Sequence, residues 1–320
     1  MESTDVLIAL VGDNPVSVLV AVRGLLPRRL VLLATHKTEA KAKVVGGLAK
    51  IPCAVLVWPD VPAIDALGAE LVQDAALRSS ERVVLDITGA TKQMTIGAWL
   101  ALERRGVGFG AVALQNTGSW VDARSGKALP QPELGADDHL ALHQMRCVAS
   151  TWRGAPHELP ADLLRRIAEA MDLFRRLIAG RLRPFAGKDD GFRSQNTCLE
   201  EVALASVCQR VTDKAVRGYF QCRVTSSDGP YNDVFDVVFV RGGNVVVVEA
   251  KVQRGNDLGA SLQKRAQKAR AAFGLCRVVF LLPAASADSL RAIEPSMPHC
   301  DLIQSDLEAY VTAVTRGLGL

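Results

Sequence analysis

The chain has 320 residues, 49% of them hydrophobic, and a formal net charge of +4. This length favours two domains, and no apolar run is long enough to cross a membrane, which excludes an integral membrane protein. Seven cysteines, an odd number without a C-x-x-C spacing, argue against a disulfide framework and a cysteine zinc site, and indicate reduced thiols. The positive excess lies entirely after residue 150, which fits either a polyanionic partner or a solvated basic surface.

The N-terminus is acidic and leads directly into a strand-like run, MESTDVLIALVG. It lacks the basic region and cleavage site of a signal peptide, so we expect a cytoplasmic protein without a membrane partner.

The first half alternates short apolar runs with helical patterns. Near-continuous apolar strands between helices predict a parallel sheet covered on both faces. The predicted strands are 5–12, 29–35, 53–59, 82–89 and 110–116, and the predicted helices are 15–22, 39–48, 63–77 and 92–104.

Ligands of such sheets bind at the carboxyl ends of the strands. Small, polar or basic residues follow four of these strands and are therefore candidates for ligand binding: Gly12, Asp13 and Asn14; Thr35, His36 and Lys37; Thr88 to Lys92; and Asn116, Thr117 and Gly118.

The run Asp86–Lys92, DITGATK, ends a buried strand and opens a helix. Backbone amides at a helix N-terminus, small residues, two threonine hydroxyls and a lysine suit a phosphate group. The spacing is not that of a P-loop, and no G-x-G-x-x-G follows the first strand, which disfavours an NTPase or a dinucleotide coenzyme. An ordinary, well-capped strand-to-helix turn is the alternative interpretation.

Residues 119–160 are rich in turn-forming residues and predict a boundary region. From Asp162, apolar residues at helical spacing through Ile178 predict an amphipathic helix, with an exposed basic face. That face suits either a solvated linking helix or contact with nucleic acid or a partner subunit. We therefore expect a first domain at 1–136, a helical linker at 137–189 and a second domain at 190–320.

The second domain shows the order helix, three strands, helix, strand. The ranges are a helix at 198–211, strands at 219–224, 234–240 and 244–252, a helix at 261–273 and a last buried strand at 277–283. The connection Arg241–Asn244, RGGN, between two β-branched runs predicts a hairpin.

Two carboxylates lie on the arms of this hairpin, Asp236 on one and Glu249 on the other, and Lys251 shares a face with Glu249. Two acids on apolar strands repel unless a cation lies between them. Mg²⁺ or Mn²⁺ would satisfy both, with the Ala250 carbonyl as a further ligand. Lys251 could then hold an attacking water or neutralise charge on a phosphodiester.

The pattern Asp236…Glu249-Ala250-Lys251 on a hairpin, between helices, resembles the PD-(D/E)xK nuclease superfamily. The resemblance implies a restriction-endonuclease-like mixed α/β domain with Asp236, Glu249 and Lys251 as catalytic residues and a further acid, Glu200 or Glu201, on the preceding helix. We favour Glu200 slightly. A surface hairpin with incidental charges is the alternative. Four basic residues of the next helix, Lys264, Arg265, Lys268 and Arg270, could with Gln263 track a sugar–phosphate backbone or form a solvated face.

The DITGATKQM stretch resembles the signature of CARF domains, the Rossmann-like sensors of CRISPR-associated proteins, with Ala90 in place of their second glycine. These sensors pair about a two-fold axis and bind a cyclic oligoadenylate across the dimer. The resemblance implies ligand contacts from residues 12–14 and Ser17, from Thr35 and His36, and from Thr88, Gly89, Ala90, Thr91 and Lys92.

A CARF-like half joined to a PD-(D/E)xK half is similar to stand-alone nuclease effectors of type III CRISPR systems. The resemblance implies a homodimeric, metal-dependent nuclease of antiviral defence, activated by a cyclic oligoadenylate such as cyclic tetra-adenylate. Two alternatives stay open: a sensor that also degrades its own ligand through Thr88, Thr91 or Lys92, and a non-catalytic regulator. The sequence leaves open whether the substrate is DNA or RNA and whether it is single- or double-stranded.

Overall fold

The computed structural model describes residues 4–58, 81–89, 91–115, 120–130, 132, 134–179, 195–226, 229–252, 258–283, 285, 287–297 and 300–320, with 69, 71, 73 and 77. The chain divides into two compact units, Met1–Leu134 and Gly135–Leu320. No helix in these described ranges is long and apolar enough to cross a membrane.

The first unit is built on a six-stranded sheet in the order β3-β2-β1-β4-β5-β6. The first five strands of that order are parallel, and β6 adds antiparallel to β5. The strands are β1 (Val6–Val11), β2 (Arg29–Thr35), β3 (Cys53–Trp58), β4 (Val83–Asp86), β5 (Phe109–Leu114) and β6 (Trp120–Asp122). The predicted parallel sheet is confirmed, with β6 as an addition to it.

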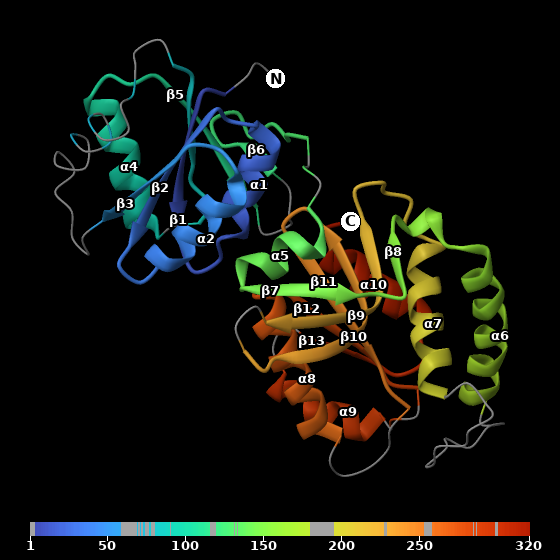
Figure 1. The fold of residues 1–320 in the computed structure, drawn as a ribbon. Helices are drawn as coiled ribbons and strands as arrows, with labels where there is room; N and C mark the ends of the chain where they lie inside the picture. Colours follow the sequence, from blue (N-terminus) through green and yellow to red (C-terminus); the bar gives the residue numbers. More distant parts are fainter. Residues whose placement is uncertain are drawn as a thin grey trace. The chain divides into compact units, whose positions relative to one another are not determined.

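Helices cover both faces of this sheet (Figure 1). The helices are α1 (Val16–Leu25), α2 (Glu39–Ala49) and α4 (Lys92–Arg104). Alternate residues of β1, such as Ile8 and Leu10, join Ala98 of α4 in one core cluster. The other side chains of β1 are also fully buried, and Gly46 of α2 lies against Leu32 on that face. The continuous apolar runs therefore arise because both faces are covered. The helix predicted at 63–77 lies largely outside the described residues.

The second unit contains a seven-stranded mixed sheet in the order β13-β12-β11-β10-β9-β7, with β8 also paired to β9. The pairs from β7 to β11 are antiparallel, and β11, β12 and β13 are parallel. The strands are β7 (Met145–Ala149), β8 (Trp152–Gly154), β9 (Arg217–Ser226), β10 (Asn232–Arg241), β11 (Asn244–Ala250), β12 (Arg277–Leu281) and β13 (Cys300–Ile303).

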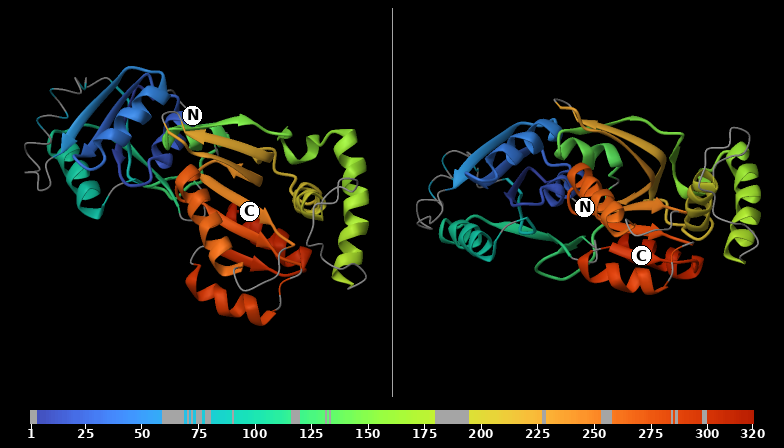
Figure 2. Two further views of the ribbon diagram at one scale, coloured as in Figure 1. Left: turned by 60° about the horizontal axis from the view of Figure 1, so that its bottom comes forward. Right: turned by 90° about the horizontal axis from the view of Figure 1, so that it is seen from below.

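Two layers of helices sandwich this mixed sheet (Figure 2). Helices α6 (Ala161–Ile178), α7 (Gln195–Cys208) and α10 (Leu307–Gly317) contribute to one core. The opposite core receives α5 (Ala136–Leu142), α8 (Leu258–Phe273) and α9 (Ala287–Ile293). Strand residues alternate between the two cores, with Val246 and Val248 of β11 in the first and Val245 and Val247 in the second.

The predicted hairpin forms as expected. Arg241 pairs with Asn244, so Gly242 and Gly243 make a two-residue turn, in which Gly242 has a φ of 54°. Two-residue hairpin turns of this hand favour residues without a Cβ, which explains the Gly-Gly pair.

The helical linker predicted at 137–189 is not separate from the second unit. Strands β7 and β8 pair with β9, and α6 packs against α7 through Leu163, Ile167 and Phe174. Strand pairing and the apolar face of α6 hold this segment in the second unit. The sequence did not predict β7 and β8 because these strands are too short to show a clear alternation of apolar and polar residues. The expectation that 277–283 is the last strand was also wrong, because β13 and α10 follow it.

The packing of α6 predicts a large effect of Phe174→Ala. This side chain is 4% exposed, so its truncation should lower the free energy of unfolding of the second unit by about 3 to 5 kcal/mol. Leu164→Ala on the same helix, where the side chain is 48% exposed, is the matched control and should cost less than about 1 kcal/mol. Urea unfolding measures both, and equal losses would show that α6 is not part of the core.

Candidate functional site

The hairpin brings Asp236 and Glu249 to the same end of the mixed sheet. Val237 pairs with Val248, and the residues just beyond this pair are Asp236 and Glu249. The backbone amide of Ala250 donates a hydrogen bond to Asp236 Oδ2 at 2.8 Å. Asp236 is 7% exposed and Glu249 is fully buried. The two arms therefore place two carboxylates in the interior, next to the backbone of Ala250.

Glu200 of α7 joins this pair of acids. Burial and the neighbouring charge of Asp236 raise the pKa of Glu200 to about 7, and the same two causes raise the pKa of Glu249 to about 7. Burial also raises the pKa of Asp236. Glu201 is directed elsewhere, with its Oε1 3.6 Å from Arg166 Nε. Of the two acids on the helix, Glu200 is thus the one whose pKa the charge of Asp236 raises.

Lys251 lies beside the acids at the end of β11. Its Nζ is 3.8 Å from Glu249 Oε2, and its side chain is 28% exposed. The alternation of side chains along the strand puts Lys251 on the same face as Glu249, as the sequence predicts. The structure therefore gathers Glu200, Asp236, Glu249 and Lys251, which we call the hairpin acid site.

Arg265 of α8 has a different place from the one we predicted. Instead of lying on an exposed basic face, it is 16% exposed and binds Glu249 through two hydrogen bonds, Nε to Oε2 at 2.7 Å and Nη2 to Oε1 at 2.5 Å. Its Nη1 also donates to Asp233 Oδ1 at 2.6 Å. Lys268, one turn further on, pairs with Asp233 Oδ2 at 2.5 Å. Both basic residues thus contact carboxylates of β10 and β11, Arg265 from a largely buried position and Lys268 from a partly exposed one.

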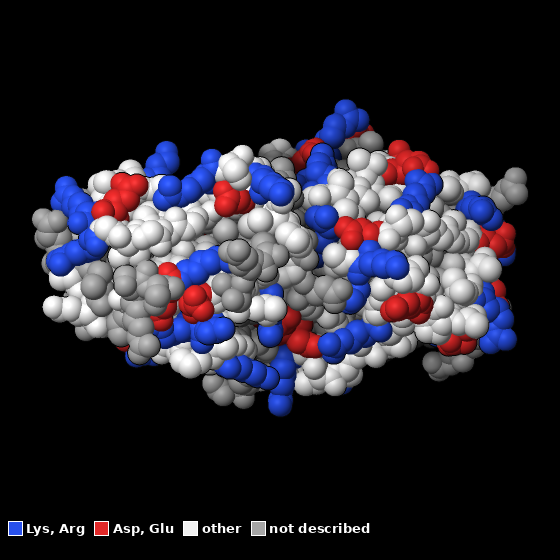
Figure 3. All heavy atoms as spheres, turned by 90° about the horizontal axis from the view of Figure 1, so that it is seen from above, with Lys and Arg blue, Asp and Glu red and all other residues white. Residues whose placement is uncertain are grey.

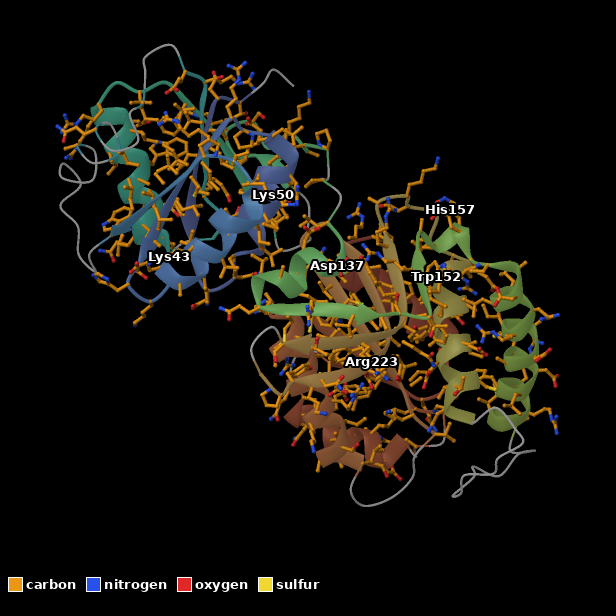
Figure 4. All side chains as sticks on the ribbon, viewed as in Figure 1. Lys43, Lys50, Asp137, Trp152, His157 and Arg223 are labelled. Carbon is orange, nitrogen blue, oxygen red and sulfur yellow. The ribbon has the colours of Figure 1, made fainter. Side chains whose placement is uncertain are left out.

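Gln221 is a residue of the site that the sequence analysis did not single out. Its φ is 50°, in the left-handed region, and the pairing of β9 with β10 skips from Phe235–Cys222 to Val237–Phe220 at this point. The Gln221 amide nitrogen donates to Glu200 Oε2 at 3.0 Å, and its oxygen accepts from Thr151 Oγ1 at 2.7 Å. Thr151 precedes Trp152 of β8, which Figure 4 labels. Irregular backbone in a strand often marks a functional site, but sequence alone does not reveal it.

The donor set of the hairpin acid site fits a hard divalent cation. Asp236 and Glu249 supply carboxylate oxygens, and Ala250 supplies a backbone carbonyl, which are ligands that Mg²⁺ and Mn²⁺ prefer. The raised pKa values of these acids show that nearby positive charge does not fully compensate them. In the described part of the chain, no group of three or more His, Cys, Asp or Glu side chains is arranged to hold a metal ion. A two-carboxylate site with a carbonyl ligand does not need a third side chain.

The predicted ligand residues of the first unit meet at one edge of its sheet. Because β1 pairs in parallel with both β2 and β4, the carboxyl ends of these three strands lie side by side. A Cβ on Gly89 would lie 2.4 Å from the Leu10 carbonyl oxygen, 3.2 Å from Ser17 Oγ and 3.5 Å from the Gly12 nitrogen. Glycine at position 89 therefore lets the turn after β4 approach the loop after β1.

Two threonine hydroxyls of this turn have structural partners. Thr88 Oγ1 donates to Asp86 Oδ1 at 2.6 Å and accepts from the Leu114 amide at 2.8 Å. Thr91 Oγ1 accepts from the Met94 amide and caps α4. Lys92, in contrast, is exposed at the start of α4. Ala90 and residues 116–118 lie outside the described residues.

The loops after β1 and β2 are held by short polar contacts. Lys41 Nζ binds the Asp13 carbonyl oxygen at 2.9 Å, and Asn14 Oδ1 accepts from the Val16 amide at 3.2 Å. Thr38 Oγ1 accepts from the Thr35 amide at 3.0 Å. The His36 side chain is exposed. These contacts fix the backbone at the sheet edge and leave Asp13 and His36 directed to solvent.

No protein-family model and no curated protein matches the chain. Solved structures match over almost its whole length. The protein VC1899 from Vibrio cholerae has a TM-score of 0.71 and 13% identity, with 98% of each chain covered. Can2 from Sulfobacillus thermosulfidooxidans, in complex with cyclic tetra-adenylate, has a TM-score of 0.65 and 13% identity, with 98% and 99% covered. A type III CRISPR defence DNA nuclease activated by cyclic oligoadenylate has a TM-score of 0.67 and 19% identity, with 99% of this chain and 53% of that chain covered.

The burial of the hairpin acids predicts a specific pH dependence of stability in metal-free protein. Because the pKa of Glu249 is raised from 4.5 to about 7, the folded state holds its proton more tightly than the unfolded chain. The free energy of unfolding should therefore fall as the pH rises through this window. Glu249→Gln should reduce the fall by on the order of 1 to 3 kcal/mol. Urea unfolding in EDTA between pH 5 and 8 measures this, and identical pH profiles for the two proteins would contradict it.

At the level of fold, the structure and these similarities agree: the chain shares its two-unit fold, a parallel-sheet unit followed by a mixed-sheet unit, with VC1899, Can2 and the type III CRISPR defence DNA nuclease.

Proposed function

We propose that this protein is a metal-dependent nuclease of type III CRISPR defence that a cyclic oligoadenylate activates. The observation that carries the proposal is the hairpin acid site, in which the buried Asp236 and Glu249 and the partly buried Glu200 lie beside Lys251. Burying several carboxylates close together lowers the stability of the fold, so we do not expect such a cluster in a unit where it has no function. The fold similarity to Can2 in complex with cyclic tetra-adenylate and to a cyclic oligoadenylate-activated DNA nuclease supports the same proposal.

Each residue of the hairpin acid site has a proposed role. Asp236, Glu249 and the Ala250 carbonyl hold Mg²⁺ or Mn²⁺, and Glu200 adds negative charge to the site. When bound, such a cation activates water and offsets negative charge on the phosphodiester. Lys251, held within 3.8 Å of Glu249 and partly exposed, is placed to meet the phosphate or the attacking water.

The first unit is the proposed sensor. Backbone amides at the start of α4, Lys92 and the loops after β1 and β2 surround one sheet edge, where parallel sheets bind ligands. Cyclic tetra-adenylate is the ligand we propose, bound between two copies of this chain. A ligand that contacts two subunits favours one arrangement of them, and this preference can drive activation.

The two alternative functions have less support. Degradation of the ligand through Thr88 would require its hydroxyl to leave both Asp86 and Leu114. A purely regulatory second unit has no use for two buried acids with a third, Glu200, beside them. The charged surface does not select a substrate, because Lys and Arg are mixed with Asp and Glu on the face shown in Figure 3. The cleavage assay therefore includes both DNA and RNA.

Cleavage should depend on the hairpin acid site. Glu249→Ala or Asp236→Asn should lower the rate at least a hundredfold, because each change removes a proposed metal ligand. Ligand binding should be unchanged, and EDTA should have the same effect as the substitutions. Glu308→Gln, which changes an exposed acid paired with Arg210, is the matched control. Activity within about tenfold of wild type in both acid-site variants would reject the assignment.

Ligand binding should depend on Lys92. A charge-assisted hydrogen bond contributes about 1.5 to 3 kcal/mol, and a ligand shared by two subunits loses two such contacts in Lys92→Ala. The affinity for cyclic tetra-adenylate should fall by roughly two to four orders of magnitude, with Mn²⁺ binding unchanged. Isothermal titration calorimetry measures both affinities.

The matched control for Lys92→Ala is Arg28→Ala. Arg28 is 77% exposed and lies just before β2, at the opposite edge of the same sheet. Its substitution removes one positive charge and should leave the affinity unchanged. Equal affinities of the Lys92 variant and wild type would show that the turn at 88–92 is structural only.

A further inference from the structure

Arg265 makes contacts that are unusual for a basic residue beside a proposed metal ligand. Its guanidinium donates to both carboxylate oxygens of Glu249, to Asp233 Oδ1, and through Nη2 to the Val234 carbonyl at 2.6 Å. Its Cζ also lies 5.3 Å from the centroid of the Phe235 ring. The guanidinium thus has several partners, and the one that accepts two hydrogen bonds from it is the fully buried Glu249.

These contacts have a direct consequence for a cation that approaches Glu249. Both oxygens of this carboxylate already accept hydrogen bonds from one guanidinium, in the two-pronged geometry that suits arginine. A divalent ion has to take at least one oxygen from Arg265, and it also meets the positive charge of Arg265 at short range. Metal binding and the Arg265–Glu249 contact therefore oppose each other.

We propose that Arg265 is a built-in counter-ion that occupies Glu249 in the metal-free protein and lowers its affinity for the divalent cation. The inference rests on the proposed function, since it concerns the regulation of the same site. In the metal-free protein, Arg265 compensates a carboxylate whose isolated burial would be costly. When the ion binds, it replaces this contact, so Arg265 sets the metal concentration at which the site fills.

The surroundings of Arg265 allow it to release Glu249 without losing all partners. Asp233 and the Val234 carbonyl lie on the start of β10 and take no part in the proposed metal site. Lys268 holds Asp233 through its other oxygen, which keeps this acid in place. A rotation of the Arg265 side chain toward Asp233 can therefore free Glu249, while the guanidinium remains paired. The Arg265 guanidinium thus moves from one carboxylate to another, and its charge is never left buried without a partner.

The direct test is the binding of Mn²⁺ to the full chain without nucleic acid, at pH 8, with free Mn²⁺ measured by electron paramagnetic resonance. Arg265→Gln removes the charge and should bind Mn²⁺ about tenfold more tightly than wild type. Arg265→Lys keeps the charge but cannot hold both oxygens of Glu249, and its affinity should lie between the two. Arg291→Gln removes a guanidinium paired with Asp288 elsewhere in the unit, and is the matched control with no expected change.

The outcomes separate this inference from the proposed function. Circular dichroism first shows that each variant is folded; if Arg265→Gln is not, Arg265→Lys decides. Equal or weaker Mn²⁺ binding in the folded Arg265 variant would overturn the counter-ion role, while loss of binding in Glu249→Gln would still support the metal site. If wild type and Glu249→Gln bind Mn²⁺ equally, the metal site itself fails, and the counter-ion role fails with it. Tighter binding in the Arg265 variant that also disappears in the double variant Arg265→Gln/Glu249→Gln supports the proposal.

Discussion

The compensation of buried negative charge organises the second unit. Two carboxylates, Asp236 and Glu249, are buried and a third, Glu200, is partly buried, and burial is the main reason that their pKa values rise. Arg265 and Lys251 offset part of this charge, and the Ala250 amide and Gln221 each bind one acid. Such a cluster lowers stability unless positive charge compensates it, and a divalent cation is the further counter-charge that we propose for this site.

The mixed sheet explains why these groups meet at one point. Strand β11 pairs antiparallel with β10 and parallel with β12, so its carboxyl end lies where the direction of the sheet changes. Glu249 is at this end, and Asp236 reaches it across the hairpin. The irregular backbone at Gln221 places its side-chain amide beside Glu200 of α7. Four elements thus contribute to a site that no single motif contains.

In the first unit, the candidate site is shaped mainly by backbone geometry, whereas in the second unit it is shaped mainly by charge. Gly89 is required because a side chain there would collide with the Leu10 carbonyl. The hydroxyls of Thr88 and Thr91 hold the turn and the start of α4 in place. The groups of this edge that we propose for the ligand are the backbone amides of the turn and the exposed side chains of Lys92, Asp13 and His36. A site of this kind recognises the shape and charge of a phosphate backbone more than the chemistry of a base.

The sequence by itself determined the elements whose patterns are local. Continuous apolar runs predicted the parallel sheet, a Gly-Gly turn predicted the hairpin, and the spacing of Asp236, Glu249 and Lys251 predicted that they share one face, because side-chain alternation and turn geometry act within a few residues. The tertiary structure decided the rest. It paired β7 and β8 with β9, directed Glu200 and not Glu201 toward Asp236, gave Gln221 its left-handed backbone, and turned Arg265 inward onto Glu249. These features depend on contacts between residues far apart in the chain. The sequence of α8 shows that one of its faces is basic, but only the tertiary structure shows whether that face meets solvent or, as with Arg265, a buried acid.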